Sequence, residues 1–431
     1  MDLSVLVLIT SFVVLIALSV PIAYSIGIST ILTMLFTISS GPAVTTVAQR
    51  VATGIDSFAL LAIPFFILSG LLMGRGGIAR RLIDFAKALV GMFPGGLAYV
   101  NVVACMFFGA ISGSAVAATS AIGGFMIPIM NKEGYDKNFN TAVTVTASTT
   151  GLLIPPSNVL IVYSLASGGV SIAALFIAGY LPGILVGIGL IIVAAILAGM
   201  KKYPVGESQN FIASLKRLID AIPSLFLIVI VIGGIIAGLF TATEASAVAV
   251  IYSLLLSVLI YREVKWADLP GILIKTVETT AIVMFLIGTS TAMSWILSYE
   301  NIPQDISKFL IALTDSKIII LLMINLILLV VGTFMDMTPA ILIFTPIFLP
   351  VVTQLGVTPL QFGIVMVLNL SIGLTTPPVG SVLFVGCGIG NTSIMSLTRA
   401  LVPFYIIMII ALLLVTFIPW ISLYLPQLFG F

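Results

Sequence analysis

Histidine is absent from this 431-residue sequence, and cysteine and charged residues are scarce. Without histidine, the chain can form neither a histidine-ligated metal site nor a histidine proton relay. Cys105 and Cys387 both fall in apolar segments, so we expect packed thiols without a disulfide or redox function. The net charge of +2 is small and dispersed, and it predicts no nucleic-acid partner.

Hydrophobic residues make up 60% of the chain, charged residues only 7%, and the mean hydropathy is +1.30. These values lie far outside the range of water-soluble domains, and they predict an all-α, multi-pass protein of the lipid bilayer. Asp2 stands where a secretory leader carries basic residues, and no small-residue cleavage site precedes Pro21. We therefore expect no cleavable signal peptide.

Apolar segments of about 20 residues, each able to cross the hydrocarbon core as a helix, recur along the chain. The predicted crossings are 3–20, 22–39, 57–73, 138–166 and 173–199, followed by 223–241, 244–261, 276–297, 360–388 and 400–424. Two other stretches, 97–130 and 318–350, are interrupted by "FGAISGSA" and "GTFMDMT". Their halves of roughly 12 to 16 residues are too short to span, so we predict two re-entrant helical hairpins.

An internal repeat organises these segments. Without gaps, 128–172 matches 350–394 at eleven positions, many of them glycine or proline, which carry backbone geometry rather than hydrophobicity. The matches include Gly151/Gly373, Pro155/Pro377 and Pro156/Pro378. We predict two units, 1–200 and 223–431, joined by a cytoplasmic linker at 201–222.

The predicted units are inverted, because each has five crossings and one hairpin and five is odd. On this topology the three basic residues Arg50, Lys308 and Lys317 lie on one face. The other fourteen of the 17 lie on the opposite face: Arg75, Arg80, Arg81, Lys87, Lys132, Lys137, Lys201, Lys202, Lys216, Arg217, Arg262, Lys265, Lys275 and Arg399. Because basic residues favour cytoplasmic loops, we predict that both termini are periplasmic.

Paired prolines interrupt one predicted crossing in each unit, in "LIPPSN" at 153–158 and "LTTPPVGS" at 374–381. Each pair removes two backbone donors in a medium that offers no water. Unwound carbonyls can ligate Na+, and the N-terminal ends of half-helices attract anions. With the two hairpin tips, four interrupted helices would meet near the midplane, as in inverted-repeat secondary transporters.

We predict one Na+ site in each unit and no other metal or cofactor. The first comprises Ser112, Gly113 and Ser114 of the hairpin tip with Gly151, Pro155, Ser157 and Asn158 of the broken helix. The second comprises Gly332, Thr333 and Asp336 with Gly373, Thr375, Thr376 and Pro378. The alternative is that serine and glycine only let helices pack closely. Their grouping in four repeat-related clusters favours binding.

Asp336 is the ionisable residue that this topology places at mid-depth, where a charge indicates function. Alternatively, Asp336 or Thr338 could cap a half-helix that begins at Pro339, and the two roles are compatible. The topology places no lysine or arginine at mid-depth. An anion would therefore be held by helix ends, hydroxyls and bound Na+.

Three amphipathic stretches, 77–91, 266–275 and 303–313, are typical of helices that lie along the bilayer surface. They could brace a stationary scaffold or simply anchor the chain.

Five segments resemble the large membrane subunit of the tripartite ATP-independent periplasmic (TRAP) transporters, and the resemblance covers essentially the whole chain. They are "SFALLAIPFFILSGLLM" at 57–73, "FFGAISGSAVAATSAIG" at 107–123, "GLLIPPSN" at 151–158, "GLFTATEASAVAV" at 238–250 and "IGLTTPPVGS" at 372–381. The resemblance implies a Na+-driven importer of an organic acid anion, such as sialic acid or a C4-dicarboxylate, in the bacterial inner membrane. It implies a small four-helix membrane subunit as a separate chain, a soluble periplasmic substrate-binding protein and an elevator motion. We expect the sialic acid branch.

Two other functions compete with this one. A stand-alone divalent-anion symporter would need no binding protein, but such carriers commonly show Ser-Asn-Thr at the hairpin tips. Here the tips read Ser112-Gly113-Ser114 and Met335-Asp336-Met337. A membrane-embedded enzyme would need catalytic or cofactor groups, and the sequence has neither paired thiols nor a cluster of buried acids. We therefore expect no enzymatic activity.

Overall fold

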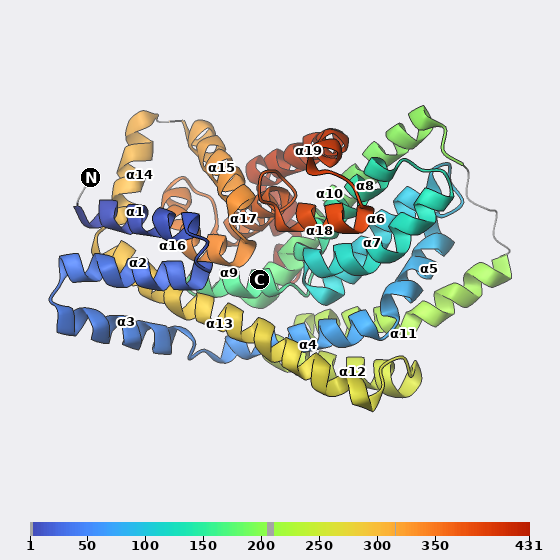
Figure 1. Ribbon diagram of the computed structural model, residues 1–431, viewed down its shortest axis with the longest axis horizontal. Helices are drawn as coiled ribbons and strands as arrows, with labels where there is room; N and C mark the ends of the chain where they lie inside the picture. Colours follow the sequence, from blue (N-terminus) through green and yellow to red (C-terminus); the bar gives the residue numbers. More distant parts are fainter. Residues whose placement is uncertain (1–2, 205–210, 315) are drawn as a thin grey trace.

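A computed structural model describes residues 3–204, 211–314 and 316–431, and every regular element in these ranges is a helix (Figure 1). Eight of the described helices are long and apolar enough to cross a membrane. The predicted all-α membrane class is therefore confirmed.

The elements of the first half, in chain order, are α1 (Leu3–Ala17), α2 (Ile22–Thr37), α3 (Ser40–Gly54), η1 (Phe58–Leu61), α4 (Ala62–Arg75), α5 (Ile78–Val90), α6 (Gly96–Ser112), α7 (Ala115–Lys132), α8 (Lys137–Ser148), η2 (Thr149–Leu152), α9 (Asn158–Ala166) and α10 (Ile172–Lys201). Helix α3 is not among the predicted crossings. Its sequence, SGPAVTTVAQRVATG, is rich in small and polar residues and gives no hydropathy peak.

The elements of the second half are α11 (Phe211–Ile236), α12 (Ala242–Leu254), the π-helical η3 (Leu255–Ile260), η4 (Trp266–Asp268), α13 (Leu269–Tyr299), α14 (Ile302–Leu313), α15 (Lys317–Phe334), α16 (Met337–Gln354), α17 (Pro359–Gly373), α18 (Ser381–Gly390), α19 (Ile394–Phe417) and α20 (Pro419–Leu428). The predicted linker 201–222 includes 205–210, which lie outside the described residues. Residues 211–222 belong to α11.

Helix α13 corrects two expectations. The crossing predicted at 276–297 extends over 31 residues, and most of the predicted surface helix 266–275 forms its first turns. Pro270 stands in the first turn of α13, where a missing N–H leaves no hydrogen bond unmade, so the helix continues without interruption.

The two predicted hairpins are α6–α7 and α15–α16, and their arms are longer than expected. The arms have 17, 18, 18 and 18 residues, and α15 and α16 are each long enough to span a membrane. Pro128, Pro346 and Pro350 lie inside these helices without ending them. The polar tips alone therefore divide the arms.

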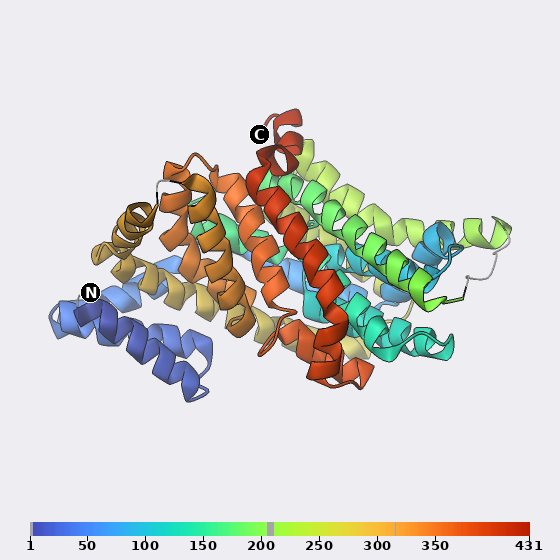
Figure 2. The same ribbon diagram turned by 90° about the horizontal axis from the view of Figure 1, so that it is seen from above.

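Helices α1–α3 lie together at one end of the molecule, and the long α13 runs from them toward α12 (Figure 1). Helix α13 packs on α2, α3, α4 and α16, so it links the first segment of the chain to the second hairpin. Helices α10 and α19 lie side by side across the opposite part, as the view from above shows (Figure 2). Each hairpin packs on the interrupted helix of its own half, α6 and α7 on α8 and α15 and α16 on α17.

Candidate functional site

The first hairpin turns at Gly113, which has a φ of +60° and caps α6 in the left-handed conformation that suits glycine. The hydroxyl of Ser114 then accepts a hydrogen bond from the backbone N–H of Ala117 at 3.2 Å and caps α7. A Cβ added to Gly113 would lie 3.3 Å from Nδ2 of Asn158. The tip therefore contacts the start of α9.

The first broken helix consists of α8, the short turn η2, a non-helical segment at 153–157 and α9. The hydroxyl of Ser157 donates to the carbonyl of Leu152 at 2.7 Å and closes this segment. Gly151 lies against α6, since an added Cβ would be 2.2 Å from the Cα of Gly109. Oδ1 of Asn158 is buried and has no hydrogen-bond partner among the described residues.

The second half repeats this construction. Helix α17 ends at Gly373, residues 374–380 are not helical in a regular way, and α18 begins at Ser381. An added Cβ on Gly373 would lie 2.5 Å from the Cα of Gly332 in α15. The hydroxyl oxygen of Ser381, like Oδ1 of Asn158, is buried without a partner in the described part of the chain.

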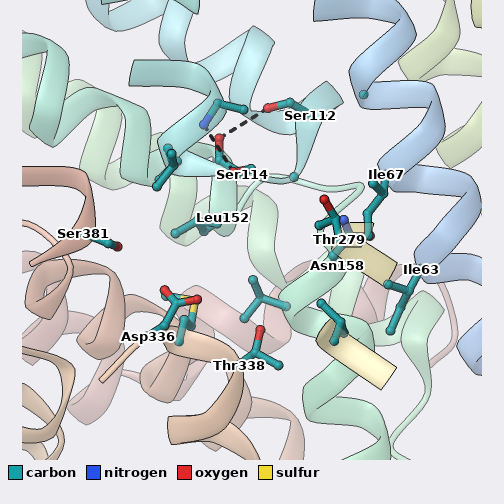
Figure 3. A pocket seen from close by; sticks show the side chains of 18 of the residues that line it. Ile63, Ile67, Ser112, Ser114, Leu152, Asn158, Thr279, Asp336, Thr338 and Ser381 are labelled. Atoms are coloured by element: carbon teal, nitrogen blue, oxygen red, sulfur yellow. Dashed lines mark hydrogen bonds between the residues drawn. The ribbon is translucent and has the colours of Figure 1, made fainter. Parts of the chain in front are cut away.

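Asp336 lies at the tip of the second hairpin, and its backbone occupies the N-cap position of α16, which begins at Met337, two residues before Pro339. Its side chain makes no capping hydrogen bond and is exposed. Figure 3 shows the carboxylate directed into the open space between the hairpins. The capping role that we considered for Asp336 is therefore not its role here.

These tips and breaks surround one cavity of about 420 Å³ (Figure 3). The first half contributes residues 112–117, Leu152 and the start of α9, and the second half contributes Asp336, Met337, Thr338, Leu374, Ser381 and Val382. Two further helices close the wall: α4 with Ile63, Ile67, Gly70 and Leu71, and α13 with Lys275, Thr279 and Val283. The cavity thus has one wall of interrupted helices and one wall of continuous helices.

Five of the predicted site residues line this cavity: Ser112, Gly113, Ser114, Asn158 and Asp336. The other nine are not part of its lining: Gly151, Pro155, Ser157, Gly332, Thr333, Gly373, Thr375, Thr376 and Pro378. Gly151 and Gly373 serve helix crossing, as described above. The hydroxyls of Thr375 and Thr376 each donate to the carbonyl of Ile372 at 2.8 Å. They stabilise the last turn before the second break.

Sequence reasoning missed Lys275, Thr279, Thr338 and Ser381 as lining residues. Lys275 matters most, because the sequence predicts it at the end of the surface helix 266–275 on the cytoplasmic face, yet it lies in α13 at the cavity. Its Nζ is 3.2 Å from the carboxylate of Glu278, and both side chains are more than half exposed. Such an exposed ion pair is weak, so the ammonium group of Lys275 remains able to bind another anion.

The lining of the cavity offers oxygen ligands together with one ammonium group. No group of three or more acidic, cysteine or histidine side chains occurs among residues 3–204, 211–314 and 316–431. The available oxygens are hydroxyls, amides, carbonyls and one carboxylate, a set that suits Na+ better than a transition metal. Lys275 provides a positive charge at the same cavity.

Comparison with known proteins identifies one family over nearly the whole chain. Residues 9–421 match the family described as "Tripartite ATP-independent periplasmic transporter, DctM component". The uncharacterized protein YgiK of Salmonella typhimurium is 52% identical, over 99% of this chain and 98% of its own length. The C4-dicarboxylate TRAP transporter large permease protein DctM of Pseudomonas aeruginosa is 41% identical, over 94% of both chains.

A more distant relative and one solved structure complete the comparison. The sialic acid TRAP transporter large permease protein SiaM of Vibrio cholerae is 37% identical, over 95% of both chains. The crystal structure of the YdaH transporter from Alcanivorax borkumensis covers 89% of this chain and 88% of its own, with a TM-score of 0.66 and 14% identity. At this level of identity, the similarity concerns the fold alone.

Proposed function

Because the chain belongs to the DctM component of the TRAP transporters, we propose that it is the membrane subunit that moves a small organic acid anion inward with Na+. One observation supports the coupling of anion transport to Na+. Asn158 and Ser381, the first residues of the half-helices after the two breaks, each bring a buried, unpartnered oxygen to the same cavity as Asp336. Oxygens left without partners in this part of the chain are suited to a cation.

In this proposal Na+ and the anion bind together. Asp336 and the neutral oxygens hold Na+, and the bound cation then lowers the electrostatic cost of bringing a carboxylate into the cavity. Lys275 and the hydroxyl of Thr279 meet the anion from the wall of continuous helices, and the hydroxyl of Thr338 meets it from the second hairpin. Each ion balances the charge of the other, so each binds more tightly when the other is present. Such a coupling between two binding events is the condition for coupled transport.

The cargo is a small organic acid anion. A cavity of about 420 Å³ is within the range that binds small molecules. The relatives do not favour the sialic acid branch that we expected, since the C4-dicarboxylate permease is 41% identical and the sialic acid permease 37%. We therefore place C4-dicarboxylates first and sialic acid second in a test of substrates.

Transport would proceed by an elevator motion of two inverted units. The wall formed by α4 and α13 would be the stationary scaffold, and the hairpins with α9 and α18 would move past it carrying Na+ and the anion. The amphipathic α5 and α14 would brace the scaffold at the bilayer surface, with both termini periplasmic. A separate small membrane subunit and a soluble periplasmic binding protein would complete the transporter in the bacterial inner membrane.

Reconstitution in proteoliposomes tests this proposal. The chain is incorporated with the small membrane subunit, a candidate binding protein is added outside, and uptake of labelled succinate and N-acetylneuraminate is measured with and without an inward Na+ gradient. We expect uptake only with Na+ and the binding protein together. Full uptake without the binding protein would favour a stand-alone symporter, and full uptake without Na+ would reject the coupling.

A further inference from the structure

A second cavity of about 480 Å³ lies farther along α13, and the site described above does not use it. Helix α13 contributes Ser290, Ser294, Trp295 and Ser298 to its wall, and Arg50 reaches it from α3. The three serines are four residues apart, so they form a stripe of hydroxyls along one side of the helix. The cavity is therefore polar along one wall and carries a basic residue at its edge.

The same three helices line both cavities. Along α13 the lining passes from Thr279 and Val283 to Ser290 and Ser294, a step of about 10 Å between Val283 and Ser290 at 1.5 Å per residue. Helix α9 lines the first cavity with Val162 and the second with Leu165. Helix α16 lines the first cavity with Met337 and Thr338 and the second with Leu342 and Pro346, so the two cavities follow one another along the same three helices.

Two polar groups that line the second cavity are available to a ligand. The hydroxyl of Ser290 is buried, with 2% of the residue exposed, and has no hydrogen-bond partner in the described ranges. Arg50 is exposed and forms no ion pair with the described residues; its guanidinium lies 5.7 Å from the ring centroid of Trp295. A buried hydroxyl without a partner and a guanidinium that line the same cavity both suit a carboxylate with neighbouring hydroxyls.

We propose that this cavity is a second binding station for the organic anion, in which Arg50 pairs with a carboxylate while Ser290 and Ser294 donate to the same ligand. This assignment rests on the proposed transport function. On the predicted topology Arg50 belongs to the periplasmic face, so this station receives the anion before it reaches the cavity at Asp336. It assigns substrate recognition to α3, a helix that the sequence did not predict.

Thiol labelling tests the station without knowledge of the cargo. Ser294→Cys is reacted with a negatively charged and a neutral methanethiosulfonate reagent, and the labelling of the parent chain through Cys105 and Cys387 is subtracted. We expect Arg50→Gln to lower the ratio of the anionic to the neutral rate about fivefold, because the arginine concentrates anions locally. The control Lys308→Gln removes a charge from the same predicted face outside the cavity and leaves the ratio unchanged.

An unchanged ratio in Arg50→Gln overturns the proposal, and so does a Ser294→Cys thiol that neither reagent reaches. Uptake supplies the second measurement: with whichever of succinate or N-acetylneuraminate the parent imports, Arg50→Gln raises the apparent KM about tenfold, and Arg50→Lys restores part of it. A raised KM with an unchanged labelling ratio would mean that Arg50 docks the binding protein instead.

The two proposals fail separately. If the parent chain shows no Na+-dependent uptake, the transport function fails, while the labelling ratio still decides whether this cavity attracts anions. If uptake is Na+-dependent and the ratio does not respond to Arg50, only the second station is lost.

Discussion

The two halves of the central cavity have the same backbone construction but different chemistry. In each half, the first arm of a hairpin crosses a broken helix at a pair of glycines, Gly109 with Gly151 and Gly332 with Gly373. The first tip, residues 112–114, is mostly buried and brings only hydroxyl and backbone groups. The second tip brings the exposed carboxylate of Asp336.

The comparison of the two halves distinguishes residues that shape the cavity from the residue that charges it. The glycine crossings are needed in both halves because they bring the tips and the breaks to one place. The charge is present in one half only, so the two halves cannot contribute equally to ion binding. Variants of the crossings should therefore have similar effects in both halves, whereas variants of the tips should not.

The largest effect is expected at the crossings. In Gly151→Ala the new methyl group would lie 2.2 Å from the Cα of Gly109, and in Gly373→Ala it would lie 2.5 Å from the Cα of Gly332. Because the obstructing atoms are backbone, the helices must separate, at a cost of about 1–3 kcal/mol or more. We expect both variants to lose transport and to unfold at lower temperature in a thermal-shift assay.

Two glycines serve as matched controls for these variants. Nothing lies within 4 Å of a Cβ added to Gly124 in α7 or to Gly388 in α18. Gly124→Ala and Gly388→Ala should keep both transport and melting temperature. If Gly151→Ala behaves like Gly124→Ala, the crossing is not a constraint on the site.

The next effect is expected at Asp336. Asp336→Asn keeps the size of the side chain and removes its charge, so the Na+ concentration for half-maximal uptake should rise at least about tenfold, equivalent to about 1.4 kcal/mol. Asp336→Glu should recover part of the affinity, because it restores the charge. Melting temperature without Na+ should be little changed, since the side chain makes no capping hydrogen bond.

An unchanged Na+ requirement in Asp336→Asn would remove the asymmetry between the halves. The first tip provides the comparison: Ser112→Ala, which removes a neutral oxygen, should raise the Na+ requirement less than Asp336→Asn does. Equal shifts would indicate that the charge contributes nothing beyond an oxygen ligand.

The sequence predicted the parts of this site that depend on local backbone chemistry. Paired prolines at 155–156 and 377–378 located both breaks, and the polar runs around Gly113 and Asp336 located both tips. The family and the all-helical membrane class were also predicted and are confirmed. The inverted topology, the unit boundaries and the coupling to Na+ remain predictions.

The missing parts depend on contacts between distant segments. Lys275 and Thr279 line the cavity only because α13 packs beside the second hairpin, and no local pattern indicates that packing. Gly109 faces Gly151 for the same reason. Glycine and threonine near a break can also serve helix packing or end a helix, so their presence alone does not distinguish a ligand from a structural residue.

A smaller effect is expected at Ser381, which tests whether the unpartnered oxygens bind the cation. Ser381→Ala should raise the Na+ requirement about fivefold, the effect of losing one neutral ligand of about 1 kcal/mol. Ser422 is the control, because its hydroxyl is also buried without a partner among the described residues but lies in α20, outside the cavity lining. Equal responses of Ser381→Ala and Ser422→Ala would attribute the effect to packing.

The smallest effect is expected at Lys275, the positive charge opposite Asp336. Because its pair with Glu278 is exposed and weak, Lys275→Gln should leave melting temperature unchanged and raise the KM for the anion about threefold, with a smaller difference at high salt. Asp305 and Lys308 form another exposed i,i+3 ion pair, at 3.4 Å and outside the cavity, so Lys308→Gln should change neither quantity. If Lys275→Gln raises the Na+ concentration for half-maximal uptake and leaves the KM for the anion unchanged, Lys275 acts on Na+ binding. The proposal that Asp336 serves the cation and Lys275 the anion would then be wrong.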